Sequence, residues 1–231
     1  MDLSDYACVI PSKGTSRRIP HKNVSLFYGR PLFVWSVIHA RAVGLEDVAV
    51  ITDTQEIACV AEDNGCGVVF EPEGGFDAAG HAVEWAVAQK LIPDKHVITL
   101  LPTQPLRDLQ WILTMIDMHR TGHWLVVSVA YDCTGYLCTK DHRPIWPPGH
   151  TPTKPIYMAD MPKLYRGGGG LSLCDKGVFA MPGGPAALSG GPRHGLLLLP
   201  KKEAIRCIDL DDPEDWLLGE AMAAVLDGKV E

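Results

Sequence analysis

Short apolar runs alternate with longer amphipathic segments over the first 130 residues, and this rhythm constrains the fold more than any other feature. The apolar runs predict buried strands at 6–11, 48–52, 67–70, 96–101 and 124–130. The segments between them carry apolar residues at helical spacing and predict helices at about 31–43, 55–64, 78–90 and 109–119. Such alternation is typical of right-handed βαβ crossovers, so we expect an α/β fold with a mostly parallel sheet.

The rhythm breaks after residue 130. Residues 132–170 are rich in glycine and contain six prolines, a composition that disfavours a central strand or helix. We expect this segment to leave the sheet as an extended arm. Beyond it, short strands are expected at 171–174, 177–180, 195–199 and 205–210, and a final helix at 213–226. The chain is expected to form one domain, 1–231, with 132–170 as a dimerisation or acceptor-binding arm.

The composition of the chain argues against several classes of protein, including nucleic-acid-binding and membrane-spanning proteins. The 231 residues are 46% hydrophobic and carry a net charge of −7, without a long block of Lys and Arg, so we expect no nucleic-acid partner. No apolar run approaches the 18 or so residues of a membrane helix, and the acidic start does not resemble a signal peptide, so we expect a cytoplasmic protein with no membrane partner. Seven cysteines without a C-x2-C pair favour buried thiols over disulfides or a zinc site.

The loop after the first strand contains the largest group of candidate ligand-binding residues. In open parallel sheets, ligands bind at the carboxyl ends of the strands. Residues 11–23 follow such an end, and they read PSKGTSRRIPHKN. Four cations next to glycine, serine and threonine can hold a polyphosphate through backbone N–H groups and charge, although a solvated basic loop is the alternative. The Walker A pattern is absent, so this is not a P-loop of that type.

This loop resembles the opening motif of the acylneuraminate cytidylyltransferases, I-P-A-R-G-G-S-K-G-I-P-x-K-N followed by G-K-P-L. Three later segments are similar in order and spacing: TDTQEI at 52–57 to T-D-S-x-E-I, PTQPLR at 102–107 to P-T-S-P-L-R, and IDLDDPED at 208–215 to I-D-I-D-T-P-E-D. Tyr165-Arg166 before a glycine run is similar to Y-R-x-N-G. Together the motifs extend from residue 9 to residue 216.

The resemblance implies a three-layer αβα, Rossmann-like mixed sheet of the nucleotide-diphospho-sugar transferase type, in a homodimer. It also implies the reaction of CTP with an acidic sugar to give a CMP-sugar and pyrophosphate. The sugar hydroxyl attacks the α-phosphate in line, so the enzyme needs to position substrates and neutralise charge, and no protein nucleophile is required. Mg²⁺ is the implied cofactor.

The resemblance assigns roles to named residues. The implied nucleotide-binding residues are Pro11, Lys13, Gly14, Ser16, Arg17, Lys22, Asn23 and Asp53. The implied catalytic residues are Arg17, Lys22 and Asp211. Asp209 and Asp211 match the metal-binding pair of the family, and on the expected strand they would face the same side. Asp212, followed by Pro213, is instead explained as the N-cap of the last helix.

The acceptor side departs from the family pattern. The implied substrate-binding residues are Gln104, Arg107, Lys163 and Arg166. Arg107 is either a substrate-contacting cation or a structural salt-bridge partner, and Arg166 either binds a carboxylate or is an exposed arm residue. Leu101 and Gly168 replace two amide residues of the family, which suggests a different acceptor.

Two features of the first loop leave the acceptor open. Lys13 replaces the usual arginine of the acylneuraminate family, and Arg18 gives the loop a feature of the Kdo cytidylyltransferases. We therefore expect a cytidylyltransferase for a nonulosonic or sialic-acid-like sugar. The alternatives are a nucleotidyltransferase for Kdo or a phosphonate, and a catalytically inactive nucleotide-binding protein.

Overall fold

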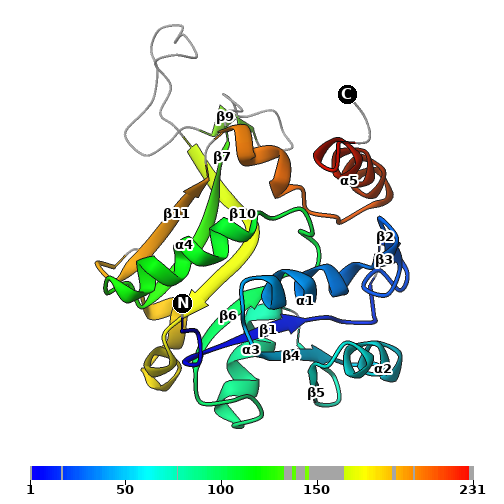
Figure 1. The fold of residues 1–231 in the computed structure, drawn as a ribbon. Helices are drawn as coiled ribbons and strands as arrows, with labels where there is room; N and C mark the ends of the chain where they lie inside the picture. The colour runs from blue at the N-terminus through cyan, green and yellow to red at the C-terminus, as the bar shows by residue number, and fades with distance from the viewer. Residues whose placement is uncertain are drawn as a thin grey trace, which may run out of the picture.

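The computed structural model describes residues 2–16, 18–76, 78–132, 137–138, 144–145, 164–188, 191–199 and 201–228. A seven-stranded sheet forms its centre (Figure 1). The strands are β1 (Tyr6–Pro11), β4 (Asp47–Thr52), β5 (Gly67–Phe70), β6 (His96–Leu100), β7 (Leu125–Asp132), β10 (Leu164–Cys174) and β11 (His194–Leu199). Their spatial order is β11-β7-β10-β6-β1-β4-β5.

The sheet is mixed and mostly parallel, as predicted. β1 pairs in parallel with β4 and β6, β4 with β5, and β11 with β7. β10 runs antiparallel between β6 and β7. The carboxyl ends of the six other strands therefore lie at one edge of the sheet, and that of β10 lies at the opposite edge.

Helices cover both faces of the sheet, which confirms the three-layer fold. The helices are α1 (Leu32–Ala42), α2 (Gln55–Asp63), α3 (Ala79–Ala88), α4 (Leu109–Arg120) and α5 (Pro213–Leu226). The larger core joins α1, α2 and α4 to the face that holds Ile10, and a second core joins α3 to the face that holds Val9. α5 packs through Ala223 against Phe27 and Leu210, beside the end of the sheet (Figure 1). Among the described helices, none is long and apolar enough to cross a membrane.

The two ends of the predicted arm lie in strands of the sheet, at Asp132 in β7 and at 164–170 in β10. Residues 164–170 form the first part of the central strand β10, although four consecutive glycines occupy 167–170. A register shift between Gly167 and Ser172 accommodates this run, and Gly170 takes a φ of +56° that suits glycine. Within the predicted arm, β8 (Leu137–Cys138) and β9 (Pro144–Ile145) form a short antiparallel pair. The rest of the predicted arm lies outside the described residues.

A second short antiparallel pair joins β2 (Leu26–Phe27) to β3 (Arg30–Pro31).

The strands predicted at 177–180 and 205–210 are wrong. Residues 177–180 belong to the 3₁₀ helix η2 (Lys176–Ala180), because the Asp175 side chain accepts the Gly177 N–H and turns the chain out of β10. Residues 205–210 do not form a strand either. Residues 205–207 belong to the 3₁₀ helix η4 (Lys201–Cys207), and residues 208–210 are irregular. There the Leu210 N–H donates to the Thr103 carbonyl of a loop, at 2.8 Å, and not to a neighbouring strand. A third 3₁₀ helix is η3 (Gly184–Leu188).

Candidate active site

A cleft of about 420 Å³ lies at the carboxyl edge of the sheet, where the loops after β1, β5 and β6 meet. Six of the residues predicted for the nucleotide and metal line it: Pro11, Lys13, Ser16, Lys22, Asn23 and Asp211. Two further residues of the first loop and six residues from elsewhere complete the wall: Thr15, Arg18, Glu71, Phe76, Ala79, Leu101, Pro102 and Thr103. Parallel pairing brings these loops together, because it places successive strand ends at the same edge.

Lys13 is anchored to the loop after β5. Its Nζ lies 3.3 Å from Glu71 Oε2 and also donates to the Phe76 carbonyl. The Glu71 side chain is 1% exposed, and its other oxygen, Oε1, has no hydrogen-bond partner among the described residues. A buried carboxylate is costly without a cation, so the two side chains hold each other at the cleft wall.

Asp53 holds the first loop in place. Its Oδ1 accepts the Gly14 N–H at 2.6 Å and its Oδ2 accepts the Thr15 hydroxyl at 2.9 Å. A Cβ on residue 14 would lie 2.3 Å from Thr54 Cγ2, so the loop approaches Thr54 only because residue 14 is glycine. Asp53 itself does not line the cleft. In this structure Asp53 positions the loop, and its contact with the nucleotide stays a prediction.

Asn23 is buried between the loop and the cleft. Its Nδ2 donates to the Lys13 carbonyl at 2.7 Å, which fixes the amide. Its Oδ1 is buried and finds no partner in the described part of the chain. An acceptor left without a donor costs free energy, so this oxygen is ready to take a donor from a ligand.

Lys22, Arg18 and Asp211 form an ionic cluster across the cleft. Lys22 Nζ lies 3.2 Å from Asp211 Oδ1 and donates to the Leu210 carbonyl at 2.9 Å. Arg18 Nη2 lies 2.8 Å from Asp211 Oδ2. Counting Lys13 and Glu71, the described lining residues comprise three cations and two carboxylates. The cleft is therefore net positive within a chain of net charge −7, and this favours an anionic ligand.

Asp209 and Asp211 do not lie on a strand, in contrast to the prediction. They flank the buried Leu210, and each lines a different space: Asp211 the cleft, and Asp209 a neighbouring cavity. Asp212 is the N-cap of α5, as predicted, and forms a capping box with Asp215. Asp215 Oδ2 also accepts the Asp211 N–H at 3.0 Å, so the start of α5 fixes the position of Asp211.

The neighbouring cavity has a volume of about 490 Å³ and shares Ala79 and Leu101 with the cleft. Its polar residues are Glu84, Thr99, Gln104, Ser172 and Asp209. The rest of its wall is mostly apolar and includes Val83, Leu125, Val127, Leu171, Phe179 and Pro185. Gln104 is 6% exposed, and its Oε1 has no partner among the described residues. Gln104 was predicted to bind substrate, and here it lines the cavity with a free acceptor.

Arg107 does not line this cavity, although its guanidinium lies close to Gly170, which does. The residue is 3% exposed, Nη1 donates to Ser36 Oγ at 2.9 Å, and Nη2 donates to the Leu101 carbonyl. Burial lowers the pKa of the guanidinium to about 10, so it stays charged at neutral pH. Of its two predicted roles, the contacts match structural support of the loop, with hydrogen bonds to a hydroxyl and a carbonyl.

Three predicted site residues remain unplaced. Arg17 and Lys163 lie outside the described residues. Arg166 belongs to β10, where its backbone pairs with Ala130, and its side chain is outside the described part of the structure. Their roles remain predictions.

Glu71 and Thr15 are site residues that the sequence motifs did not identify. Glu71 directly follows the predicted strand at 67–70, so the rule of strand carboxyl ends could have found it. Thr15 sits within the predicted loop, but no pattern indicates that its hydroxyl binds Asp53.

Comparison with known sequences places the chain among nucleotide-transferring proteins. Residues 7–126 match the sequence model of a family described as Cytidylyltransferase. The pseudaminic acid cytidylyltransferase of Campylobacter jejuni is 35% identical over 108 residues, covering 43% of this chain and 46% of the relative. The CMP-N,N'-diacetyllegionaminic acid synthase of Legionella pneumophila is 29% identical over 130 residues, covering 53% and 56% of the two chains. The chain thus spans about half the length of the curated relatives it matches.

The fold is similar along almost the whole chain to a solved structure. The structure of CMP:2-keto-3-deoxy-manno-octonic acid synthetase complexed with CTP superposes with a TM-score of 0.68 at 14% identity. The match covers 98% of this chain and all of the other. At this identity the likeness shows the fold, and the loops determine the chemistry.

Proposed function

Because the chain belongs to the cytidylyltransferase family, we propose that it transfers CMP from CTP to an acidic sugar with release of pyrophosphate. One observation carries the proposal: a basic cleft and a mostly apolar cavity adjoin at the carboxyl edge and share the wall formed by Ala79 and Leu101. The cleft suits a triphosphate and the cavity suits a sugar. Because the two spaces adjoin, a sugar hydroxyl in the cavity can approach the α-phosphate of a nucleotide in the cleft.

In this arrangement the chain positions the reactants and neutralises charge. The acceptor hydroxyl oxygen bonds to the α-phosphorus, the bond from that phosphorus to the bridging oxygen of pyrophosphate breaks, and the hydroxyl proton leaves to solvent. Lys22 and Arg18 exchange their contacts with Asp211 for contacts with phosphate oxygens. Because negative charge moves onto the leaving pyrophosphate, fixed cations there lower the barrier.

The carboxylates near the shared wall are of the kind that binds Mg²⁺. Asp211 offers its oxygens to the cleft and Asp209 offers its oxygens to the adjoining cavity, and oxygen ligands are those that Mg²⁺ prefers. Both oxygens of Asp211 lie near Lys22 and Arg18, so phosphates that draw these cations away would free the carboxylate for the metal. Bound there, Mg²⁺ would neutralise phosphate charge during transfer.

We propose a nonulosonic acid as the acceptor. The largely apolar wall of the cavity suits a sugar with methyl-bearing acyl groups, and Gln104 Oε1 offers an acceptor for a hydroxyl or an amide N–H. The two curated relatives are named for pseudaminic and diacetyllegionaminic acids. Kdo is the second candidate, since the structural relative is named for that sugar.

The test is pyrophosphate release with Mg²⁺, crossing the four ribonucleoside triphosphates with N-acetylneuraminate, pseudaminate, a legionaminate, Kdo and a simple phosphonate. We expect turnover with CTP and a nonulosonate. Higher kcat/KM with Kdo or the phosphonate would overturn the acceptor assignment. If CTP raises the melting temperature but no acid supports turnover, the chain is a nucleotide-binding protein.

A homodimer is also part of the proposal. β11 is an edge strand, and its Leu196 and Leu198 are about half exposed, which supports a contact between apolar surfaces. Light scattering after size-exclusion chromatography would test this, and a mass equal to one chain would contradict it.

A further inference from the structure

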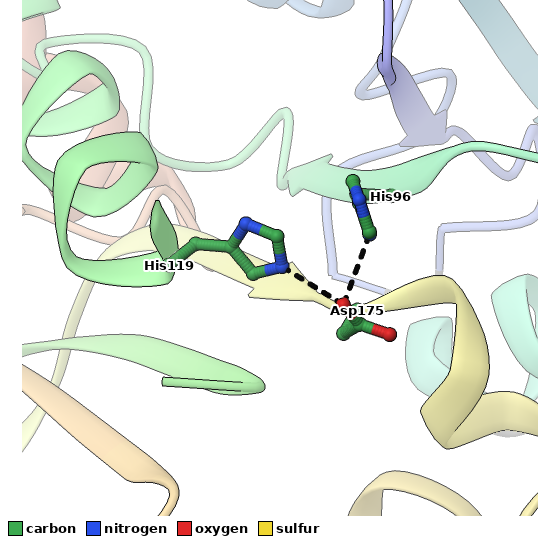
Figure 2. Close-up of side chains that lie close together, drawn as sticks. All are labelled: His96, His119 and Asp175. Atoms are coloured by element: carbon green, nitrogen blue, oxygen red, sulfur yellow. Dashed lines mark hydrogen bonds and ion pairs between the residues drawn. The ribbon is translucent and has the colours of Figure 1, made fainter. Parts of the chain in front are cut away.

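Two histidines and an aspartate converge at the amino edge of the sheet, opposite the cleft (Figure 2). His96 is the first residue of β6, His119 lies in the last turn of α4, and Asp175 follows β10. Since β10 runs antiparallel to β6, its carboxyl end meets the amino end of β6. The cluster is therefore separated from the cleft by the length of the sheet.

The three side chains approach each other at distances close to those of a metal site. His119 Nε2 lies 3.1 Å and His96 Nδ1 lies 3.2 Å from the same oxygen, Asp175 Oδ2. One ligand atom of each residue lies within 4.8 Å of the others. Zinc bonds of about 2.0–2.1 Å in a tetrahedral site place ligand atoms about 3.3 Å apart, so two of the three separations already fit.

Neighbouring groups orient these ligand atoms. The Tyr6 hydroxyl lies 3.0 Å from His119 Nδ1, leaving Nε2 directed at Asp175. Asp175 Oδ1 accepts the Gly177 N–H at 2.8 Å, leaving Oδ2 directed at the histidines. Metal-binding histidines and carboxylates commonly have such outer partners, which fix the ring orientation.

His96 Nδ1 has a second neighbour that a bound metal would displace. The Lys176 N–H donates to this nitrogen at 3.2 Å, and the nitrogen also lies 3.2 Å from Asp175 Oδ2. Because an imidazole nitrogen has one lone pair, zinc bound at Nδ1 would replace the contact with the exposed Lys176 N–H.

We propose that His96, His119 and Asp175 bind one Zn²⁺ ion, which acts as a structural clasp between α4, β6 and β10. Imidazole with one carboxylate is a zinc-type donor set, whereas Mg²⁺ prefers oxygen ligands alone. The side chains are 9–23% exposed, so the ion can enter and water can fill the fourth position. The proposal is independent of the proposed transfer reaction.

The first experiment uses the full chain freed of metal by a chelator. Isothermal titration and thermal denaturation are followed with Zn²⁺, and with Mg²⁺ as the control ion. We expect one Zn²⁺ per chain and a rise in melting temperature of roughly 5–10 °C at one hundred times Kd. No saturable binding of Zn²⁺, or an equal effect of Mg²⁺, would overturn the proposal.

Variants then locate the ion. Asp175→Asn and His119→Gln should each weaken Zn²⁺ binding at least tenfold, whereas His123→Gln should not. His123 is the matched control, because it lies near the same end of α4 and contacts the Met118 carbonyl outside the cluster. Affinities of the two cluster variants equal to the unmodified chain would show that zinc binds elsewhere.

A spectrum of the unmodified chain removes any dependence on how the variants fold. Co²⁺ replaces Zn²⁺ in tetrahedral sites, and its visible and near-ultraviolet absorption distinguishes nitrogen and oxygen ligands from thiolates. We expect a tetrahedral spectrum without thiolate charge transfer. A thiolate band would assign the metal to cysteines such as the exposed Cys59 and would overturn the proposal.

Discussion

The polar side chains discussed above differ in their hydrogen bonding between the two edges of the sheet. At the carboxyl edge, five buried side-chain atoms lack a hydrogen-bond partner among the described residues: Ser12 Oγ, Asn23 Oδ1, Thr54 Oγ1, Glu71 Oε1 and Gln104 Oε1. At the amino edge, Tyr6, His96, His119 and Asp175 contact one another in a continuous chain. An unpaired buried polar atom costs about 1–3 kcal/mol, so the carboxyl edge sacrifices stability and gains from a ligand.

If the proposed transfer takes place at the carboxyl edge, substitutions there should change kcat or KM, with or without a loss of stability. Substitutions at the amino edge should change stability alone.

The largest effect is expected for Asp211→Asn. The change leaves Lys22 and Arg18 without their carboxylate and removes a proposed metal ligand. We expect kcat to fall at least about 100-fold, which corresponds to about 2.7 kcal/mol of transition-state free energy, with the melting temperature almost unchanged. Pyrophosphate release and thermal denaturation measure both quantities.

Asp63→Asn, at the exposed end of α2, is the control for Asp211→Asn and should leave kcat unchanged. If Asp211→Asn retains more than a tenth of the turnover, Asp211 does not act in the reaction.

The next effect concerns the pair of Lys13 and Glu71. Lys13→Met keeps most of the aliphatic stem but leaves the buried Glu71 carboxylate without its cation. We expect a loss of about 1–3 kcal/mol in the free energy of unfolding and a KM for CTP raised about tenfold. Urea unfolding and initial rates would measure these changes.

The double variant Lys13→Met with Glu71→Gln sharpens this test. It should recover most of the stability, because the buried charge is gone, but not the KM. If the single and double variants unfold at the same urea concentration, the pair does not hold the cleft wall together.

Strand β10 links the two edges, and Gly170 lies within it, at the register shift beside the cavity. A Cβ there would lie 3.1 Å from the Cβ atoms of Gln104 and Leu101, at a φ of +56°. Gly170→Ala should cost about 1–2 kcal/mol and raise the KM for the acceptor more than the KM for CTP. Gly65→Ala is the control, since its φ of +68° is similar but nothing lies within 4 Å. An equal effect of both substitutions on the acceptor KM would contradict the placement of the acceptor.

Local patterns predict much of this fold. The strands and helices from 6 to 120 follow periodic runs, and the capping sequence before Pro213 predicts the last helix with its observed bounds. Only the second part of β10 was predicted, as the strand at 171–174. Its first part was missed, because 167–170 carry no side chains to show a period and pairing with the neighbouring strand β7 makes 164–167 a strand. The strand predicted at 205–210 was wrong for a different reason. This segment has the apolar pattern of a strand, but it does not pair with any strand of the sheet.

The residues of the site, like the elements of the fold, were predicted in part. The loop after the first strand predicts Lys13, Lys22 and Asn23, and the family resemblance predicts Asp211; all four line the cleft. A sequence does not show which way a carboxylate faces: Asp53 binds the loop's own N–H, and Asp209 lines the neighbouring cavity instead of the cleft. The histidine cluster was not predicted either, since its members come from three segments separated by 23 and 56 positions.

The smallest effect is expected at the amino edge, for Tyr6→Phe. The residue is 4% exposed, and the change removes only the hydroxyl that contacts His119 Nδ1. We expect a loss of about 1 kcal/mol in the free energy of unfolding, measured in urea, with kcat and both KM values unchanged. A change in the KM for either substrate would mean that the two edges are coupled through the sheet, because Tyr6 and Pro11 are the two ends of β1 and only Pro11 lines the cleft. Unchanged kinetics with lowered stability would instead show that this hydrogen-bond network supports the fold without taking part in transfer.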